Sequence, residues 1–366
     1  MEPPQRLSRR ALLRSAFLGG SGVLAAYLVG CADGGDGQAT PAPTPTLAKP
    51  TTVPQPTATP SSLGWQLISP NSANPPQPRR DHSLTTNGVT VYVFGGRSGS
   101  EELSDSWGFS ANVWASYGTE GPSPRHGHNA IWDAARDRII VFGGQQESSF
   151  LDDIWEFDTR SNEWRQLPQS GSGPAPRYGA GGAFDAAGDR MLVTHGFTNA
   201  GRFDDTWQYD LVREVWTDIS PQGARPVERC LMRAVWDSSR ERLLMFGGQT
   251  TGTAHLGDLW ALEAGGWRQI TADPSPTPRN FYSFVFDDEA GRAILFGGST
   301  QDGPADDLWQ FDSASDTWER QEAGAGPSPR FGHDAVWRTD TRSLLVFGGN
   351  DGSADLNDMW ELSVPL

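Results

Sequence analysis

At six places spaced about fifty residues apart, from Asp105 to Asp358, an aspartate stands two residues before a tryptophan, and this Asp-x-Trp pattern continues to the C-terminus. A glycine step lies ten or eleven residues before each aspartate, and five of the six steps read Phe-Gly-Gly. The steps begin at Gly95, Gly143, His195, Gly247, Gly297 and Gly348, with spacings of 48, 52, 52, 50 and 51 residues. A period near fifty residues predicts an array of repeated structural units.

The Asp-x-Trp segments read as strands with one buried face. Alternate residues of a strand point to opposite sides, so Leu151, Asp153, Trp155 and Phe157 share a face that is apolar and aromatic and carries one acid. A single unit cannot bury such a face alone, so neighbouring units must stack. All fifteen tryptophans fall on repeat positions, which favours packing over a tryptophan-lined sugar groove.

The linked motifs resemble those of the kelch family from Trp65 to Leu366: a Pro-x-Pro-Arg opening, an apolar strand ending in a double glycine, Asp-x-Trp and a closing Trp. The resemblance implies an all-β, six-bladed kelch β-propeller with four-stranded blades over residues 63–366. The last copy has no closing Trp, and an orphan Trp65 precedes the first copy. We therefore predict that the N-terminal strand around Trp65 completes the last blade and closes the ring.

The N-terminal residues do not belong to the repeat. Within residues 1–30, Arg9-Arg10 resembles a twin-arginine export motif, and an apolar stretch leads to Leu28-Val29-Gly30-Cys31, which resembles a bacterial lipobox. This order predicts a signal peptide and a lipoprotein lipidated at Cys31, on the extracytoplasmic face of a bacterial membrane, at the cell surface or in the periplasm. An uncleaved membrane anchor is the alternative. Residues 31–62, rich in Pro and Thr, predict a disordered linker.

The charge of the chain excludes some partners. The net charge is −16, and loss of residues 1–30, which carry one Glu and four Arg, makes it −19. Such an acidic protein is unsuited to nucleic acid, or to an anionic membrane except through its anchor. With Cys31 lipidated only Cys230 remains, so no intrachain disulfide forms. We expect a monomer.

Every copy begins with an arginine, and together these predict a ring at one mouth of the central channel. In characterised kelch propellers, arginines at this position can contact acidic ligands, and the resemblance implies the same for this chain. The alternative is that each arginine pairs with the Asp of an Asp-x-Trp, since a buried acid needs a partner. The arginines are Arg79, Arg125, Arg177, Arg229, Arg279 and Arg330.

The residue after each arginine differs in every copy, which predicts a tailored surface. These residues are Arg80, His126, Tyr178, Cys230, Asn280 and Phe331. We predict that the six ring arginines bind the ligand together with His126, Tyr178, Asn280 and Phe331. Two positions further on stand three histidines, His82, His128 and His333. Because this histidine position recurs in kelch repeats, we expect hydrogen bonding there rather than a three-histidine metal site.

The sequence favours a binding module for a protein or a glycan at the arginine-rimmed mouth, and it leaves a carbohydrate-active enzyme as the alternative. Exported bacterial kelch proteins include mutarotases acting on sialic acid, for which the arginines with His126 or His128 would serve. Galactose oxidase carries a kelch-type propeller too, and Tyr178 and Cys230 on neighbouring blades would allow a Cys–Tyr cross-link. Its flanking domains and a Tyr-His pair are missing from this sequence.

No metal and no cofactor are predicted. Adjacent acids such as Asp152-Asp153 suggest a calcium site at first. Calcium needs several oxygens that converge, whereas consecutive strand residues point apart.

Overall fold

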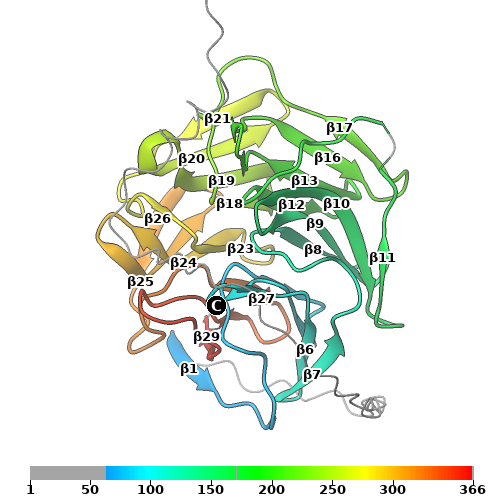
Figure 1. Ribbon diagram of the computed structural model, residues 1–366. Helices are drawn as coiled ribbons and strands as arrows, with labels where there is room; N and C mark the ends of the chain where they lie inside the picture. Colours follow the sequence, from blue (N-terminus) through cyan, green and yellow to red (C-terminus); the bar gives the residue numbers. More distant parts are fainter. Residues whose placement is uncertain (1–62, 170, 365–366) are drawn as a thin grey trace, which may run out of the picture. The chain divides into compact units, whose positions relative to one another are not determined.

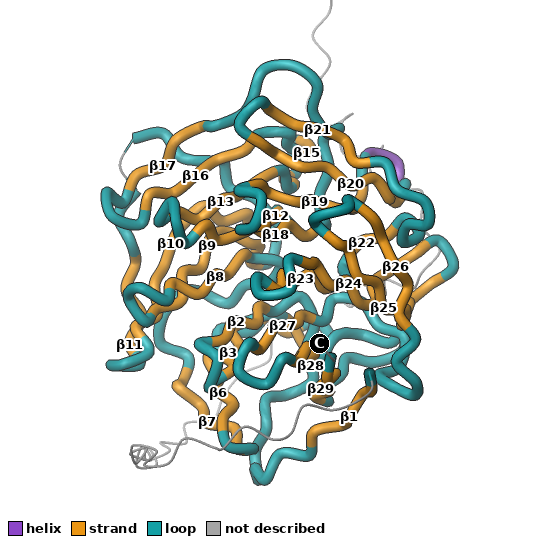
Figure 2. The backbone as a smooth tube through the Cα atoms, turned by 180° about the vertical axis from the view of Figure 1, so that it is seen from behind, coloured by secondary structure: helices purple, strands orange, loops and turns teal. Residues whose placement is uncertain are grey.

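The computed structural model describes residues 63–169 and 171–364, which form strands and turns with one short 3-10 segment, η2 (Thr251–Thr253). The strands build six antiparallel sheets that surround a central axis like the blades of a propeller (Figure 1; the view from behind is Figure 2). The predicted all-β, six-bladed architecture is therefore confirmed.

Each of the first three blades runs from an inner to an outer strand in chain order. Blade 1 contains β2 (Ser83–Thr86), β3 (Val91–Phe94), β6 (Ser106–Ser110) and β7 (Val113–Gly118). Blade 2 contains β8 (Asn129–Asp133), β9 (Arg138–Gln146), β10 (Ser149–Asp158) and β11 (Glu163–Gln166). Blade 3 contains β12 (Gly181–Asp185), β13 (Arg190–Thr194), β16 (Thr206–Asp210) and β17 (Val215–Asp218).

Blades 4 and 5 follow the same order. Blade 4 contains β18 (Arg233–Asp237), β19 (Arg242–Gln249), β20 (His255–Glu263) and β21 (Gly266–Ile270). Blade 5 contains β23 (Ser283–Asp287), β24 (Arg292–Thr300), β25 (Gly303–Asp312) and β26 (Thr317–Gln321), and short β22 (Arg279–Asn280) also pairs with β24. Two small ribbons, β4 (Arg97–Ser98) with β5 (Glu101–Glu102) and β14 (Phe197–Thr198) with β15 (Gly201–Arg202), extend the middle hairpins of blades 1 and 3.

Blade 6 is assembled from both ends of the propeller. Its strands β27 (Asp334–Arg338), β28 (Ser343–Phe347) and β29 (Met359–Ser363) are completed by β1 (Gly64–Ile68), which appears in blue beside red β29 in Figure 1. The pairing is antiparallel, with Trp65 opposite Leu362. This confirms the predicted closure by the N-terminal strand, and it gives β29 a partner on its outer edge.

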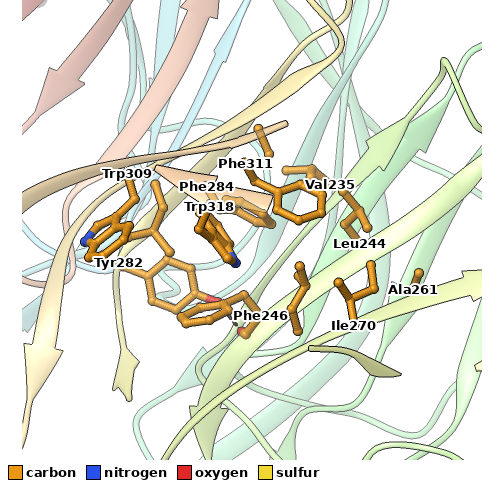
Figure 3. Packing of buried hydrophobic residues seen from close by; sticks show 13 residues of the cluster. Val235, Leu244, Phe246, Ala261, Ile270, Tyr282, Phe284, Trp309, Phe311 and Trp318 are labelled. Carbon is orange, nitrogen blue, oxygen red and sulfur yellow. Dashed lines mark hydrogen bonds between the residues drawn. The ribbon is translucent and has the colours of Figure 1, made fainter. Parts of the chain in front are cut away.

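A repeated aromatic contact holds each blade to the next. The Phe of a Phe-Gly-Gly step packs against the closing Trp of the following blade, as Phe142 does on Trp216 at 4.8 Å between ring centroids and Phe246 on Trp318 at 5.5 Å. Figure 3 shows the second pair inside the core shared by blades 4 and 5. Trp65 fills this position for blade 6, 4.9 Å from Phe296. None of the fifteen tryptophans is exposed, so their packing role is confirmed.

Candidate functional site

The six repeat arginines are buried and paired. Each is at most 1% exposed and makes a bidentate bond to the Asp of the Asp-x-Trp in its own blade, with N···O distances of 2.5 to 2.9 Å. The pairs are Arg79–Asp105, Arg125–Asp153, Arg177–Asp205, Arg229–Asp258, Arg279–Asp307 and Arg330–Asp358. We call these six pairs, with the Trp that follows each Asp, the clamps.

The remaining donors of each clamp arginine are also engaged. In blade 2, Nη1 of Arg125 donates to the carbonyl of Gly143, and Nε donates to the carbonyl of Ser123. The indole N–H of Trp155 donates to the second carboxylate oxygen of Asp153 at 2.7 Å. Burial alone would raise the pKa of Asp153, but the bonds from Arg125 and Trp155 hold it below its ordinary value. The other five clamp carboxylates show the same direction for the same reasons.

These contacts correct the expectation of an arginine-rimmed mouth. A guanidinium that is buried and already forms a bidentate pair has no surface for an acidic ligand. The structure therefore contradicts a direct ligand contact by Arg79, Arg125, Arg177, Arg229, Arg279 and Arg330. The alternative, in which each arginine pairs with the Asp of an Asp-x-Trp, holds in all six blades.

Two residues after each clamp arginine, six residues form a closed ring of hydrogen bonds around the axis, which we call the axial ring. Each amide donates to the carbonyl of the equivalent residue in the preceding blade, at 2.7 to 3.1 Å, and the last bond joins Asp81 to Gly332. All six have positive φ, between 53° and 65°. The members are Asp81, Gly127, Gly179, Leu231, Phe281 and Gly332.

Three of these members are not glycine, although a left-handed backbone costs an L-residue energy and is uncommon for bulky side chains. Asp81, Leu231 and Phe281 have φ of 55°, 61° and 53°. Their side chains line a cavity of about 30 Å³ on the axis, together with Tyr178 and Arg233. Strain of this kind is retained where the surrounding structure fixes it, and it often marks functional sites.

The residues between the clamps and the axial ring are those that the sequence marked as variable. Tyr178 and Phe331 are half-buried, and so is Arg80, whereas His126 and Asn280 are almost fully buried. Each pairs through its backbone with a residue of the hairpin between the second and third strands of the blade that its clamp belongs to. The hairpin partners are Arg97, Gln145, Phe197, Gln249, Ser299 and Asn350, all partly exposed. We call these two sets of six residues the variable face.

One sector of the variable face is charged. Arg80 pairs with Asp355, and Arg97 lies 3.4 Å from the carboxylate of Asp81. Nδ1 of His126 lies 3.2 Å from the carboxylate of Glu102. Burial, followed by the positive charges of Arg97 and Arg80, lowers the pKa of His126 to about 4. This imidazole is therefore neutral at pH 7.

The neighbouring sector is aromatic. The ring of Tyr178 meets His126 edge-on at 5.2 Å, and Phe197 meets Phe150 edge-on at 5.7 Å. The guanidinium of Arg202 lies 5.4 Å from the centre of the Phe197 ring. Across the axis, Asn280 donates to the side-chain oxygen of Gln249 at 3.0 Å. Aromatic residues and arginine, which the variable face presents in Tyr178, Phe197 and Arg97, are among the residue types enriched at protein–protein interfaces.

The three histidines serve the packing between blades. His82, His128 and His333 are buried, and each meets edge-on the Phe of a preceding Phe-Gly-Gly step, at 5.1 to 5.4 Å. His128 also lies 2.9 Å from the Ser83 hydroxyl, and His333 lies 3.2 Å from that of Ser283. Burial lowers the pKa of all three well below 6.5.

Within residues 63–169 and 171–364, no three His, Cys, Asp or Glu side chains are grouped so that they could hold a metal ion. The Cys230 thiol is buried, its sulfur lies 3.8 Å from the carbonyl of Gln249, and burial raises its pKa. A thiol with a raised pKa is a poor nucleophile.

The repeat geometry agrees with comparisons to known proteins. The family described as the KLHDC2/KLHL20/DRC7 Kelch-repeats domain matches residues 57–238 and 221–365. The chain belongs to the kelch-repeat family. The Drosophila melanogaster leucine-zipper-like transcriptional regulator 1 homolog is 29% identical over 247 residues, which cover 62% of this chain and 24% of that protein. Homo sapiens host cell factor 2 is 28% identical over 253 residues, which cover 62% of this chain and 31% of that protein.

The similarity covers only a part of each of these larger proteins. Human leucine-zipper-like transcriptional regulator 1 is 30% identical over 235 residues, which cover 59% of this chain and 27% of that protein. This kelch chain therefore spans about a quarter to a third of the length of these three curated relatives.

The predictions for the N-terminus lie outside the described residues. They concern the signal peptide in 1–30, the linker in 31–62 and lipidation of Cys31. In the part of the kelch chain that the structure describes, no helix is long and apolar enough to cross a membrane.

Proposed function

We propose that this kelch propeller is a lipid-anchored, extracytoplasmic binding module that recognises a partner protein through its variable face. The carrying observation is the contrast between neighbouring layers. The clamps are the same in all six blades, whereas the residue after each clamp arginine is different in every blade. A surface position that differs in every blade, directly beside a layer that is the same in every blade, is suited to specific binding.

The test compares partner binding by the propeller, by variants of the variable face and by a control variant in an outer turn. Residues 63–366 serve as bait for extracytoplasmic proteins and for glycan and sugar-acid arrays. We expect Tyr178→Ala and Phe197→Ala each to weaken capture of the same protein at least tenfold, because aromatic residues dominate binding energy at interfaces. The control is Arg213→Ala, at a side chain that is 78% exposed in an outer turn.

A ligand that binds both aromatic variants as tightly as the parent would exclude the variable face. Binding of a glycan, with no protein captured, would leave the site in place but change the class of ligand.

The anchor is tested separately. We expect Cys31→Ser to move the full-length protein from the membrane fraction to the soluble fraction of an exporting bacterial host, because the lipid can no longer be attached. A replacement of Arg9 and Arg10 by Lys should retain the unprocessed chain in the cytoplasm. If the Cys31→Ser protein stays in the membrane fraction, the lipid anchor is excluded and an uncleaved anchor takes its place.

One observation favours an enzyme as the second candidate. His126 is a neutral base beside Glu102, and Arg80 and Arg97 lie in the same sector. These groups supply an acid–base pair and a cation for a sugar carboxylate, as mutarotation of a sugar acid needs. The test follows the anomers of sialic acid by NMR. Acceleration that is lost in His126→Gln would support this function, and an unchanged rate with the parent protein would exclude it.

A further inference from the structure

The outer hairpins of the blades come in two lengths. In blades 2, 3 and 5, the third and fourth strands are joined by four-residue turns, such as Leu211–Glu214. In blades 1 and 4 the turns have two residues, Ala111-Asn112 and Ala264-Gly265. The sequence records this difference, because the Asp-x-Trp tryptophan and the closing Trp are nine residues apart in the first group and seven in the second.

The first residue of a long turn fills the junction with the preceding blade. Leu211 is 2% exposed, and its amide donates to the carbonyl of Asp189 at 3.0 Å. Its carbonyl accepts a bond of 3.2 Å from Nη2 of Arg138, on blade 2. Ser313 repeats this arrangement between blades 4 and 5, where its carbonyl accepts from Nη2 of Arg242 at 3.2 Å.

The junction between blades 3 and 4 has no such residue, and a cleft of about 910 Å³ lies there. Arg190 stands where Arg138 and Arg242 stand in their blades. Its Nε binds Asp185 at 2.8 Å and its Nη1 binds Gln208 at 2.7 Å. Its Nη2 has no acceptor among the described residues, and its side chain is 34% exposed. The guanidinium lies 5.7 Å from the centre of the Trp236 ring, which also lines the cleft.

We propose that this cleft binds a turn of a partner protein that has an aliphatic residue followed by a basic one. The aliphatic side chain would lie between blades 3 and 4 as Leu211 lies between blades 2 and 3. The backbone carbonyl of this ligand residue would accept a hydrogen bond from Nη2 of Arg190. The walls suit an aliphatic group, since they include Phe184, Leu192, Ile219, Trp236, Leu243 and Leu262. Burial of such a side chain in an apolar pocket is favourable.

The charge at the rim selects the basic residue. Glu241 and Asp288 line the cleft, are exposed and have no ion pair among the described residues. A third carboxylate, Glu263, is half-buried and pairs with Arg268 at 2.8 Å. Two unpaired acids beside an apolar cleft favour a cationic side chain on the ligand. The site is separate from the variable face, so its proposal does not depend on the proposed function.

The second short turn supplies an internal control. A cleft of about 510 Å³ lies between blades 6 and 1, beside Asn112. Its arginine, Arg338, donates from both terminal nitrogens, to Glu361 and to Asp340 at 3.3 Å each. Both terminal nitrogens of this guanidinium are therefore engaged, unlike Nη2 of Arg190, and the cleft is not expected to bind the same peptide.

The test uses a backbone-cyclised hairpin peptide that copies residues 208–217 of blade 3, titrated into residues 63–366 and followed by NMR or calorimetry. We expect a Kd of about 0.1 to 1 mM, which is usual for a small contact of this kind. Arg190→Gln should weaken binding about tenfold, whereas Arg338→Gln should leave it unchanged. A peptide with Ala in place of the Leu should bind at least tenfold more weakly.

A second variant fills the cleft from within. Replacing Ala264-Gly265 by Leu-Val-Arg-Glu lengthens the short turn to that of blade 3, and it should abolish peptide binding while the melting temperature holds or rises. The same replacement at Ala111-Asn112 should leave binding intact. Equal binding by all variants, absence of binding at 5 mM peptide (well above the expected Kd), or displacement by oligosaccharides with no peptide affinity would each overturn the proposal. Tyr178→Ala should not affect it, which separates this result from the test of the variable face.

Discussion

The clamps and the residues that follow their arginines are adjacent in the chain, yet they differ in almost every physical respect. Clamp arginines are buried, fully paired and identical in six blades. The next residue varies from Arg80 to Phe331 in size, charge and burial. The contrast shows how to interpret a repeat protein: a residue that recurs in every unit supports the units, and one that changes is free to specify a ligand.

The largest expected effect on stability comes from opening the ring of six blades. Deletion of residues 63–69 removes β1, exposes the outer edge of β29 and withdraws Trp65 from its contact with Phe296. We expect the free energy of unfolding to fall by more than about 4 kcal/mol, since loss of one large buried aromatic side chain alone costs about 3–5 kcal/mol. Urea denaturation measures the change against a control chain that begins at Leu63. An unchanged transition midpoint would show that β1 does not close the propeller.

Removal of one clamp acid is the next largest effect. Asp205→Ala leaves Arg177 buried without its carboxylate, and we expect a loss of about 3 kcal/mol. The matched control is Asp204→Ala, because Asp204 and its partner Arg225 are both about 40% exposed and such surface pairs contribute below about 1 kcal/mol. Tyr178→Ala, in the variable face, should reduce stability less than Asp205→Ala does. It should reduce the affinity for the partner protein more. Equal losses from Asp205→Ala and Asp204→Ala would contradict the structural role of the clamps.

Acid should weaken the propeller in two stages. Burial lowers the pKa of all six histidines in the folded state, to about 4 for His126 and about 3 for His195. The unfolded chain therefore takes up protons first, and stability present above pH 6.5 is lost as the pH falls below it. Each fully buried histidine contributes at most about 1.4 kcal/mol per pH unit.

The clamp carboxylates respond at lower pH. Their folded pKa values lie below 3.8, so the stability they supply is present above that value and is lost as the pH falls through the lower, folded values. Denaturation curves from pH 8 to pH 2 should show both stages, and His128→Gln should reduce the slope only in the first. Stability that is constant between pH 7 and pH 5 would contradict the first stage.

The smallest effects concern the axial ring. A β-carbon on Gly127 would lie 2.1 Å from the ring of Tyr178, so Gly127→Ala should destabilise by about 1–2 kcal/mol. Leu231→Gly removes a left-handed leucine, and we expect a change below about 1 kcal/mol, towards greater stability. Thermal denaturation compares the pair, and similar losses from both would show that backbone strain is not important there.

Much of the scaffold could be predicted because the residues that build it recur at a regular spacing in the sequence. The blade number, the closure by Trp65 and the packing of the tryptophans follow from residues that recur at fixed spacing. The choice between ligand-binding and clamped arginines did not follow, because it depends on whether Asp105 and its equivalents lie within reach of the guanidinium groups. Only the three-dimensional arrangement gives these distances.

The axial ring and the cleft between blades 3 and 4 are harder to predict from the sequence. Gly127, Gly179 and Gly332 suggest a left-handed position, but Asp81, Leu231 and Phe281 conceal it in the other copies. The cleft follows from a shortening by two residues, visible as a change in Trp–Trp spacing around Ala264. Its meaning depends on what Leu211 and Ser313 do at the neighbouring junctions, which a sequence does not show.

A helix always presents unbonded amides at one end and unbonded carbonyls at the other, and proteins commonly use such ends to hold anions and cations. The axial ring has no first and no last member, so all six of its amides and all six of its carbonyls are already bonded to one another. Its six peptide dipoles follow each other around a circle and largely cancel. The backbone at this mouth therefore offers a ligand neither a donor nor a net field, and discrimination there falls to the side chains alone.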